Sequence, residues 1–403
     1  MAITKLTTPS PVERDAVDLG QVVEALASVV PAPAALHEPE IAGREWEYVK
    51  ECLDTGWVSS AGAYVERFEA MLSDVTGAAH AVATVTGTAA LHAALALAGV
   101  EEGDEVIVPA LTFVSTANAV AYQGARPHFA DSEEKTLGLD AAKLADHLER
   151  ITEIQGGRCV NAETGRSIRA VVCMHTFGHP VDLDALTEVC RRFGLVLVED
   201  AAESLGTYYK GRHTGTWGRL SVLSFNGNKT VTTGGGGAIL TNDADLARAA
   251  RHLTTTAKLP HAWEFVHDQI GFNYRMPNVN AAIGCAQLER LDDFIERKRR
   301  LAQAYAAALD GIAGVRVFIE PDFARSNYWL NLLLLDPEVA DRKDELLALC
   351  HERGLQARPA WTPMHRLAMY AEDPRMDLTV AEDLYARLVN LPSSPRLAPA
   401  AIE

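Results

Sequence analysis

Three short segments carry residue types that could do chemistry together. Thr86-Gly87-Thr88 lies where a β-rich run turns into an alanine-rich helical run, and the free N–H groups at a helix start form a phosphate site. Asp200 follows an apolar run at 195–198, and Lys229 follows another at 220–225. Taken singly, these features are typical of two helix N-caps and a solvated loop lysine. Their combination is far more specific.

The three groups are the ones that pyridoxal phosphate requires of a protein. A lysine holds the aldehyde as a Schiff base, a carboxylate keeps the pyridine nitrogen protonated, and a helix terminus anchors the phosphate. A Walker P-loop is not supported, because Asn228 separates Gly227 from Lys229. A nicotinamide site is not supported either, since no GxGxxG follows a strand. We therefore expect a site for pyridoxal phosphate.

A parallel sheet is the element that could bring these residues together. Continuous apolar runs alternate with helical segments, a pattern typical of an α/β sheet covered on both faces. The expected strands are 81–85, 105–108, 170–174, 195–198, 220–225 and 238–240, and the expected helices of this part are 41–53, 63–75 and 89–98. In such sheets the site lies at the carboxyl ends of the strands. Thr86, Asp200 and Lys229 all follow strands.

The chain is long enough for a large body and a smaller second lobe. A long helix from Ala281 to about Ala308 should lead out of the sheet into α+β structure, with strands at 315–319 and 329–335 and a helix at 342–353. The expected division is an N-terminal extension at 1–35, a large domain at 36–285 and a small C-terminal domain at 286–403. Proline-rich flanks enclose an amphipathic stretch at 17–29, which we expect to dock on the body as a tether or an interface arm.

Composition narrows the class of protein. The 403 residues are 48% hydrophobic and carry a formal net charge of −17, and the basic run 297–300 lies in a helical stretch, so nucleic-acid binding is not expected. The six cysteines form no CxxC pair, which argues against structural zinc and a disulfide framework. No secretion signal or membrane-spanning run is apparent, so a cytoplasmic protein that does not enter membranes is expected.

Several segments together resemble the DegT/DnrJ/EryC1/StrS sugar aminotransferase family, and the likeness covers nearly everything after residue 36. The matching segments are 86–91, 103–109, 112–116, 199–203, 224–229, 271–276, 281–284 and 358–359. The resemblance implies a type I pyridoxal phosphate fold, with a mainly parallel seven-stranded type of sheet. It also implies a homodimer with shared active sites, and a ping-pong cycle in which pyridoxamine phosphate is the intermediate form of the cofactor.

The resemblance assigns roles residue by residue. Lys229 would be the Schiff-base lysine and proton carrier, and Asp200 the partner of the pyridine nitrogen; these are the catalytic residues. The other implied cofactor contacts are Gly87, Thr88 and Ser224 at the phosphate, Phe113 on the ring, Glu203 near the ring hydroxyl, and Asn273 reaching the phosphate from the other subunit. The family commonly has Gln where Glu203 stands and Gly-Glu-Gly-Gly where this chain has the four glycines 234–237.

Within the family, the segments 175–180, 224–229, 254–258 and 358–361 resemble the LegC-type branch of bacillosamine and legionaminic acid biosynthesis. The implied reaction transfers an amino group from L-glutamate, leaving 2-oxoglutarate, to UDP-4-keto-6-deoxy-N-acetylglucosamine. Asn226, Asn228 and Arg358 offer hydrogen bonds and charge suited to a sugar amide or a diphosphate. Ordinary loop structure is the alternative for these three residues.

Other functions remain open at this point. A GDP-linked or a 3-keto sugar could be the acceptor, and a non-catalytic regulator that binds sugar nucleotides could share the fold. A ketosugar dehydratase of the same family would lack the lysine that this chain has. His175 and His179 have the spacing of helical metal ligands, but Gly178 and Pro180 argue against a helix there, so no metal is expected.

Overall fold

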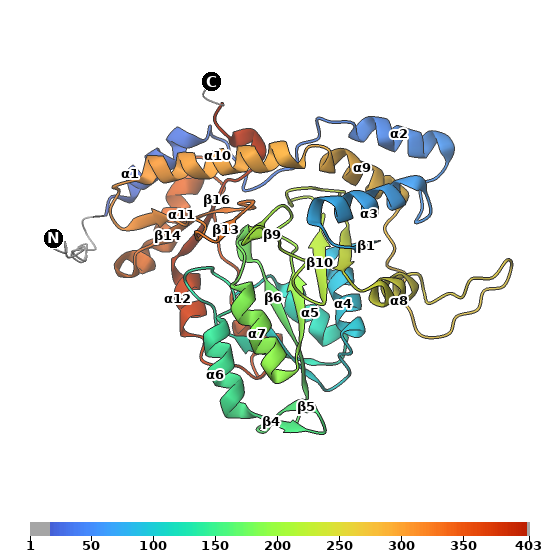
Figure 1. Ribbon diagram of the computed structural model, residues 1–403. Coiled ribbons are helices and arrows are strands. Elements are labelled where there is room, and N and C mark those ends of the chain that lie inside the picture. The colour runs from blue at the N-terminus through green and yellow to red at the C-terminus, as the bar shows by residue number, and fades with distance from the viewer. Residues whose placement is uncertain (1–16, 401–403) are drawn as a thin grey trace, which may run out of the picture.

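The structure is a computed structural model that describes residues 17–400, and a seven-stranded sheet lies at its centre (Figure 1). Its strands are β1 (His80–Thr84), β2 (Glu105–Pro109), β3 (Arg126–Ala130), β6 (Ile168–Met174), β7 (Val196–Asp200), β10 (Leu220–Ser224) and β11 (Gly237–Thr241). The order across the sheet is β1-β11-β10-β7-β6-β2-β3. All neighbours from β10 to β3 are parallel, and β11 is antiparallel to both of its neighbours. The expected mainly parallel α/β sheet is confirmed.

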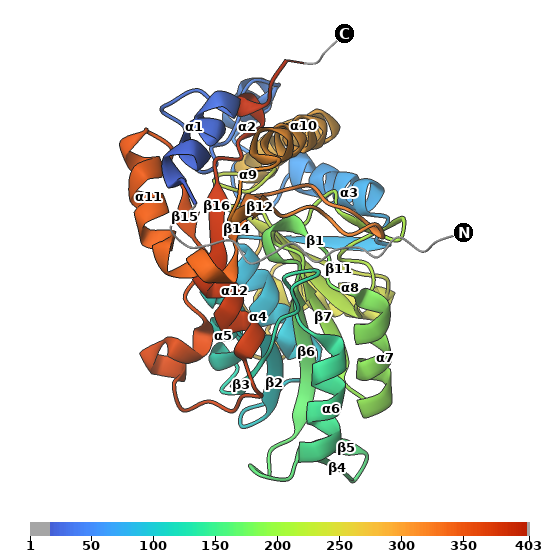
Figure 2. The same ribbon diagram turned by 90° about the vertical axis from the view of Figure 1, so that its left-hand side faces the viewer.

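Helices cover both faces of this sheet. They are α3 (Ala63–Thr76), α4 (Gly87–Leu97), α5 (Val114–Tyr122), α6 (Ala141–Ile151), α7 (Leu183–Phe193) and α8 (Ala244–Thr254). Figure 2 shows α4 and α5 on one side of the strands, and α6 and α7 on the other. Every residue of α4 from Ala89 to Leu95 is buried. This explains its alanine-rich sequence, because small side chains let it pack closely on β10, β11 and the neighbouring helices.

A second, antiparallel sheet belongs to the C-terminal part of the chain. Its order is β12 (Val315–Val317), β14 (Asn331–Leu335), β16 (Leu388–Leu391) and β15 (Arg358–Pro359). The helices around it are α10 (Leu291–Leu309), α11 (Lys343–Glu352) and α12 (Thr379–Arg387). This part of the chain therefore has the α+β structure that the sequence predicts.

The amphipathic stretch near the N-terminus forms α1 (Leu19–Val29), which lies against α10 and α11 in both views (Figures 1 and 2). Asp18 caps it by accepting a hydrogen bond from the amide of Gln21. Its apolar face buries Val22 and Leu26 against Tyr305 and neighbouring residues. The predicted docking of residues 17–29 is confirmed. The rest of the predicted extension before residue 17 lies outside the described residues.

The predicted long helix from Ala281 to about Ala308 is wrong, because the chain forms two helices there. These are α9 (Asn278–Leu288) and α10, which begins at Leu291. The break is held by tertiary contacts: Glu289 accepts from the hydroxyl of Tyr48 at 2.7 Å, and Arg290 pairs with Glu40 at 2.7 Å. Both break residues are good helix formers, so periodicity alone could not reveal the interruption.

The remaining elements are short. α2 (Glu45–Thr55) packs on α9, and small strands occur at β4 (Thr152–Gln155), β5 (Arg158–Asn161), β8 (Tyr208–Tyr209), β9 (Arg212–His213) and β13 (Ala324–Arg325). After α8 the chain runs out from the body as a long extended loop before it returns to α9 (Figure 1). Within residues 17–400, no helix combines the length and the apolar character needed to cross a membrane.

Candidate active site

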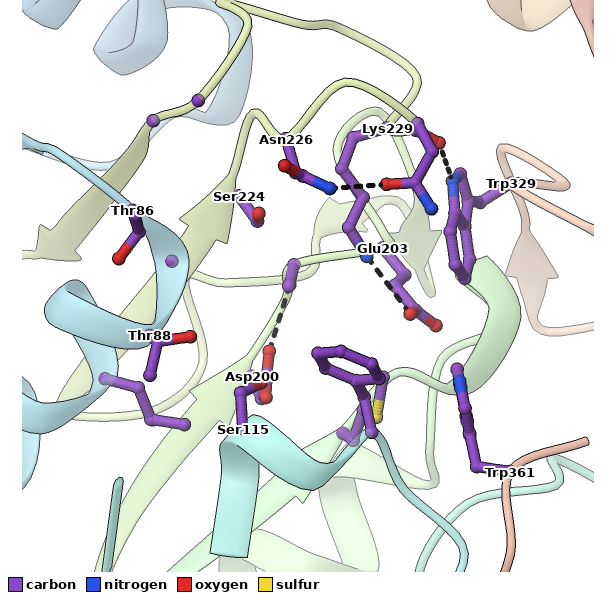
Figure 3. Close-up of a pocket in the computed structure, with 18 residues that line it drawn as sticks. Thr86, Thr88, Ser115, Asp200, Glu203, Ser224, Asn226, Lys229, Trp329 and Trp361 are labelled. Carbon is purple, nitrogen blue, oxygen red and sulfur yellow. Dashed lines mark hydrogen bonds and ion pairs between the residues drawn. The ribbon is translucent and has the colours of Figure 1, made fainter. Parts of the chain in front are cut away.

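A cavity of about 320 Å³ opens at the carboxyl ends of β7 and β10, beside the start of α4 (Figure 3). Strand ends, helix starts and two loops of the C-terminal part supply its walls. The lining residues are Thr86, Gly87, Thr88, Leu91, Phe113, Ser115, Met174, Asp200, Ala202, Glu203, Ser224, Asn226, Asn228, Lys229, Gly235, Gly236, Trp329 and Trp361. The cavity therefore brings together nearly all the residues that the sequence singles out.

Lys229 reaches into the cavity from the turn that follows β10. The turn closes with a hydrogen bond of 3.0 Å from the Lys229 amide to the carbonyl of Asn226. Its Nζ atom donates to Oε1 of Glu203 at 3.1 Å and lies 4.0 Å from the ring centre of Trp329. Only 12% of the lysine side chain is exposed. The amine is thus held inside the cavity rather than solvated, as a loop lysine would ordinarily be.

Glu203 is the carboxylate nearest to this amine. Its side chain is almost fully buried, and Oε2 accepts the backbone N–H of Phe177 at 2.9 Å. Burial raises the pKa of Glu203 to about 7, against the opposing charge of Lys229. Near neutral pH the carboxyl group can therefore carry a proton or give it up beside the lysine amine.

Asp200 is the last residue of β7, and each oxygen of its carboxylate accepts a hydrogen bond. Oδ2 accepts from the hydroxyl of Thr116 at 2.9 Å, and Oδ1 accepts from the amide of Ala202 at 3.2 Å. Thr112 in turn lies 3.0 Å from the Thr116 hydroxyl. Burial raises the pKa of Asp200, whereas these two hydrogen bonds oppose that rise. The carboxylate is fixed in direction and shielded from water.

The start of α4 forms the opposite end of the cavity. Thr86 caps the helix by accepting the amide of Ala89 at 3.0 Å, which leaves the first N–H groups of the helix directed outward. A Cβ atom at Gly87 would lie 2.8 Å from Cβ of Ser224. Only glycine lets the helix start and the end of β10 approach so closely, and the resulting cradle suits an anionic group.

Aromatic rings and two amides complete the walls. Trp361 stacks on Phe177 with ring centres 4.5 Å apart and lies 6.3 Å from the ring of Phe113. Asn226 donates to Oδ1 of Asn228 at 3.0 Å. Trp329 was not predicted from the sequence as a site residue, and Trp361 belongs to the segment 358–361 that resembles the family. The position of Trp329 at the start of the predicted strand 329–335 was the available signal.

The chain is similar in sequence to a known family and to several of its members. The family model described as the DegT/DnrJ/EryC1/StrS aminotransferase family matches residues 39–403. The chain belongs to this family. GDP-perosamine synthase of Escherichia coli O157:H7 is 38% identical over 363 residues, which cover 90% of this chain and 94% of that protein. GDP-perosamine synthase of Caulobacter vibrioides is also 38% identical, over 368 residues, covering 91% and 94%.

Solved structures show the same type I fold. The aminotransferase TlmJ from Streptoalloteichus hindustanus matches with a TM-score of 0.80 and 31% identity, covering 89% of this chain and 93% of that one. DesI, solved in the presence of its TDP-sugar product, matches with a TM-score of 0.78 and 31% identity, covering 90% and 89%. The present chain is an aminotransferase, and its cofactor is pyridoxal phosphate.

The residues of the cavity fit this cofactor. A buried carboxylate with fixed orientation, a lysine whose side chain is 12% exposed and a glycine cradle at a helix start are all present in one cavity. The exposed ring of Phe113 lines the same space and provides a flat apolar surface. The donor set thus matches an aromatic ring that carries an aldehyde and a phosphate.

Two of the predicted site residues lie elsewhere. Arg358 is exposed on β15 and does not line the cavity. Asn273 is also exposed, and it pairs with Thr255 at the base of the long loop after α8. The position of Asn273 outside the cavity of its own chain is compatible with the expected reach into a second subunit, which stays a prediction.

The two histidines weighed as metal ligands have different surroundings. His175 lies 3.0 Å from a carboxylate oxygen of Glu199, whereas the ring of His179 contacts Phe318 and Tyr328 at 4.7 and 5.2 Å. Burial lowers the pKa of His179 to about 3, so the ring is neutral. Across residues 17–400, no three His, Cys, Asp or Glu side chains are grouped to hold a metal ion.

Proposed function

We propose that this aminotransferase transfers the amino group of L-glutamate to the keto carbon of a nucleotide-linked 4-keto-6-deoxy sugar. The observation that carries the proposal is the placement of the Lys229 amine, enclosed by Glu203 and Trp329 in a cavity that also contains Asp200. That arrangement suits proton transfer at a bound amino compound. The family membership and the similarity to enzymes named for sugar nucleotides support the sugar acceptor.

When bound, pyridoxal phosphate supplies an electron sink for the carbon that loses its proton. In our proposal the start of α4, with Gly87, Thr88 and Ser224, holds the phosphate. Asp200 would face the pyridine nitrogen, and its two hydrogen bonds orient the carboxylate for that contact. Phe113 would cover the ring, and Glu203 would contact the ring hydroxyl; both residues line the cavity.

Lys229 is proposed to carry the proton. Its amine is within hydrogen-bond reach of Glu203, and the surrounding walls exclude most water. A neutral amine accepts a proton from the amino acid carbon and returns it to another carbon, which is general base and general acid catalysis by one group. Glu203, with its pKa raised to about 7 by burial, is able to stabilise the ammonium form between these steps.

For the acceptor we propose UDP-4-keto-6-deoxy-N-acetylglucosamine first, as in the LegC-type branch of bacillosamine and legionaminic acid synthesis. The side-chain amides of Asn226 and Asn228 support this acceptor. The hydrogen bond from Nδ2 of Asn226 to Oδ1 of Asn228 leaves Oδ1 of Asn226 as an acceptor and Nδ2 of Asn228 as a donor for the acetamido group. Arg358 would contribute charge for the diphosphate from outside the cavity described here. A GDP-linked sugar is the second candidate, favoured by the similarity to GDP-perosamine synthases.

We also propose that the working unit is a homodimer with shared active sites. The long loop after α8 exposes large apolar side chains: Trp263 and Phe265 are 79% and 78% exposed, and Ile270 is 91% exposed. Trp46 on α2 is 78% exposed as well. Such side chains on projecting segments are typical of protein interfaces. Asn273 lies next to this loop, where it could enter the partner's cavity. Light scattering coupled to size exclusion gives the mass that tests this.

The acceptor is tested with a panel of UDP-, GDP- and TDP-linked 4-keto-6-deoxy sugars and L-glutamate, with mass spectrometry of the products. An amino sugar formed from the UDP-linked N-acetyl compound at the highest kcat/KM supports the first choice. A preference for the GDP-linked sugar would replace it with the second. Formation of 2-oxoglutarate without any aminated sugar would contradict the sugar acceptor.

A further inference from the structure

The amine of Lys229 is surrounded by a network of contacts that involves Trp329, Asn327 and Glu203. Trp329 donates from Nε1 to the carbonyl of Asn228, the residue before the lysine, at 2.8 Å. The face of the same indole lies 4.0 Å from the lysine Nζ. One side chain of the C-terminal part therefore touches both the main chain that carries the lysine and the amine at its end, as Figure 3 shows.

Asn327 completes this network by linking Glu203 to Trp329. Its Nδ2 atom donates to the carbonyl of Glu203 at 2.8 Å, and its Oδ1 accepts the amide of Trp329 at 2.8 Å. Glu203 then accepts from Lys229 at 3.1 Å. The buried amide of Asn327 thus links the main chains of Glu203 and Trp329, the two residues whose side chains enclose the lysine amine.

The segment 326–329 is itself strongly held. Tyr328 has a φ of 47°, a left-handed conformation that is unfavourable for an aromatic residue and persists only when its surroundings fix it. Lys298, fully buried on α10, donates to the carbonyls of Trp329 and Ser393 at 3.0 and 2.6 Å. These hydrogen bonds from a buried lysine help to fix the main chain at Trp329.

We infer that Trp329 is a positioning residue for Lys229, supplied by the C-terminal part of the chain. Its indole N–H fixes the turn that carries the lysine, and its ring face holds the amine beside Glu203 whenever the amine is free. This inference deepens the proposed function and rests on it for the catalytic consequence. The contact itself can be measured without turnover.

The first test uses cofactor-free protein and the rate at which a small amine-directed acylating reagent modifies Lys229, read by peptide mass spectrometry. W329L removes the ring face and the N–H, whereas W329F keeps a ring face and loses only the N–H. Labelling of Lys229 should rise about fivefold or more in W329L, because the ring no longer contacts and covers the amine. In W329F it should stay within about twofold of the wild type.

Tyr328→Phe is the matched control. The substitution removes a hydroxyl of the same segment, which accepts a hydrogen bond from the amide of Glu320 at 3.2 Å. It leaves the contacts of Trp329 with Lys229 and Asn228 unchanged. Labelling at Lys229 should then equal that of the wild type, and labelling at the exposed Lys210 should be constant in all variants. Unchanged labelling in W329L, or an equal rise in Y328F, would overturn the inference.

The second test separates positioning from binding. In the half-reaction with L-glutamate, W329L should lower the maximal rate about tenfold or more while its half-saturating glutamate concentration changes less than about threefold. W329F should recover most of the rate. A selective rise in the half-saturating concentration would contradict a positioning role. If the wild type itself shows no half-reaction, the proposed function fails, whereas the labelling result still decides the contact.

Discussion

The Nζ atom of Lys229 and the Oε1 atom of Glu203 lie 3.1 Å apart inside the cavity, and both side chains are almost removed from solvent. Lys229 is the proposed base. It lies beside the carboxyl group of Glu203, whose pKa is raised to about 7 by burial. The carboxyl group of Glu203 can therefore bind or release a proton near neutral pH, next to the lysine side chain. The proposed proton transfer at Lys229 depends on this pairing.

Lys229→Ala should abolish multiple turnover and leave the fold intact. The side chain is both the attachment point expected for the cofactor and the proposed proton carrier, so no other group in the cavity can replace it. Turnover is measured with L-glutamate and a keto sugar, and folding by circular dichroism. Lys210→Ala, which changes an exposed lysine paired with Asp184, is the matched control and should keep full activity. Measurable multiple-turnover transamination by the Lys229 variant would refute the assignment.

Glu203→Gln should change how stability depends on pH. Because the folded pKa is raised above the unfolded value, the folded wild type binds more protons between about pH 5 and about pH 7. Its free energy of unfolding therefore falls as pH rises through that window, by up to about 3 kcal/mol. Gln does not titrate, so this contribution disappears in the variant.

The measurement is urea unfolding of both cofactor-free proteins at several pH values. The difference in the free energy of unfolding should shift in favour of the glutamine variant as pH rises. Glu188→Gln, on an exposed carboxylate paired with Arg191, should show no such shift. Parallel curves for wild type and the Glu203 variant would contradict a pKa near neutrality.

Thr116→Val should weaken the hold on pyridoxal phosphate. The valine removes the hydrogen bond of 2.9 Å to Oδ2 of Asp200, and the buried carboxylate is then held only by Ala202. A hydrogen bond to a charged group predicts a dissociation constant about tenfold or more higher, measured by equilibrium dialysis. Thr116→Ser keeps the hydroxyl and should bind as the wild type does. Equal loss in both variants would point to packing rather than the hydrogen bond.

Leu26→Ala should lower the free energy of unfolding by about 2–4 kcal/mol, since this side chain of α1 is 1% exposed against α10 and α11. Glu24→Ala breaks only an exposed ion pair with Arg353 and should cost less than about 1 kcal/mol. Urea unfolding compares the two. If Leu26→Ala changes stability no more than Glu24→Ala, α1 is not part of the core that the structure shows.

The sequence predicted the sheet and much of the cavity because strand ends are local features. Asp200 and Lys229 each follow an apolar run, and the topology of parallel strands brings such positions to one edge. Trp329 was missed as a site residue for a different reason. It reaches the cavity only because the C-terminal part packs on the large sheet, a contact that periodicity does not encode.

The positions of Arg358 and of the break before α10 show the same limit. Arg358 lies on the strand that pairs with β16, with its side chain exposed outside the cavity, and its role in the site stays a prediction. The break between α9 and α10 depends on Tyr48 and Glu40, which are distant in sequence. In the break, tertiary contacts override the helix propensity of Glu289 and Arg290.

The most direct test of the account is the absorption spectrum of the purified protein with pyridoxal phosphate, followed as L-glutamate is added. The wild type should show a visible band from cofactor joined to Lys229, which glutamate converts to the amine form of the cofactor with release of 2-oxoglutarate. Lys229→Ala should show no such band. A band that glutamate leaves unchanged would contradict the proposed donor. If the wild type forms no band at all, the assignment of Lys229 is wrong.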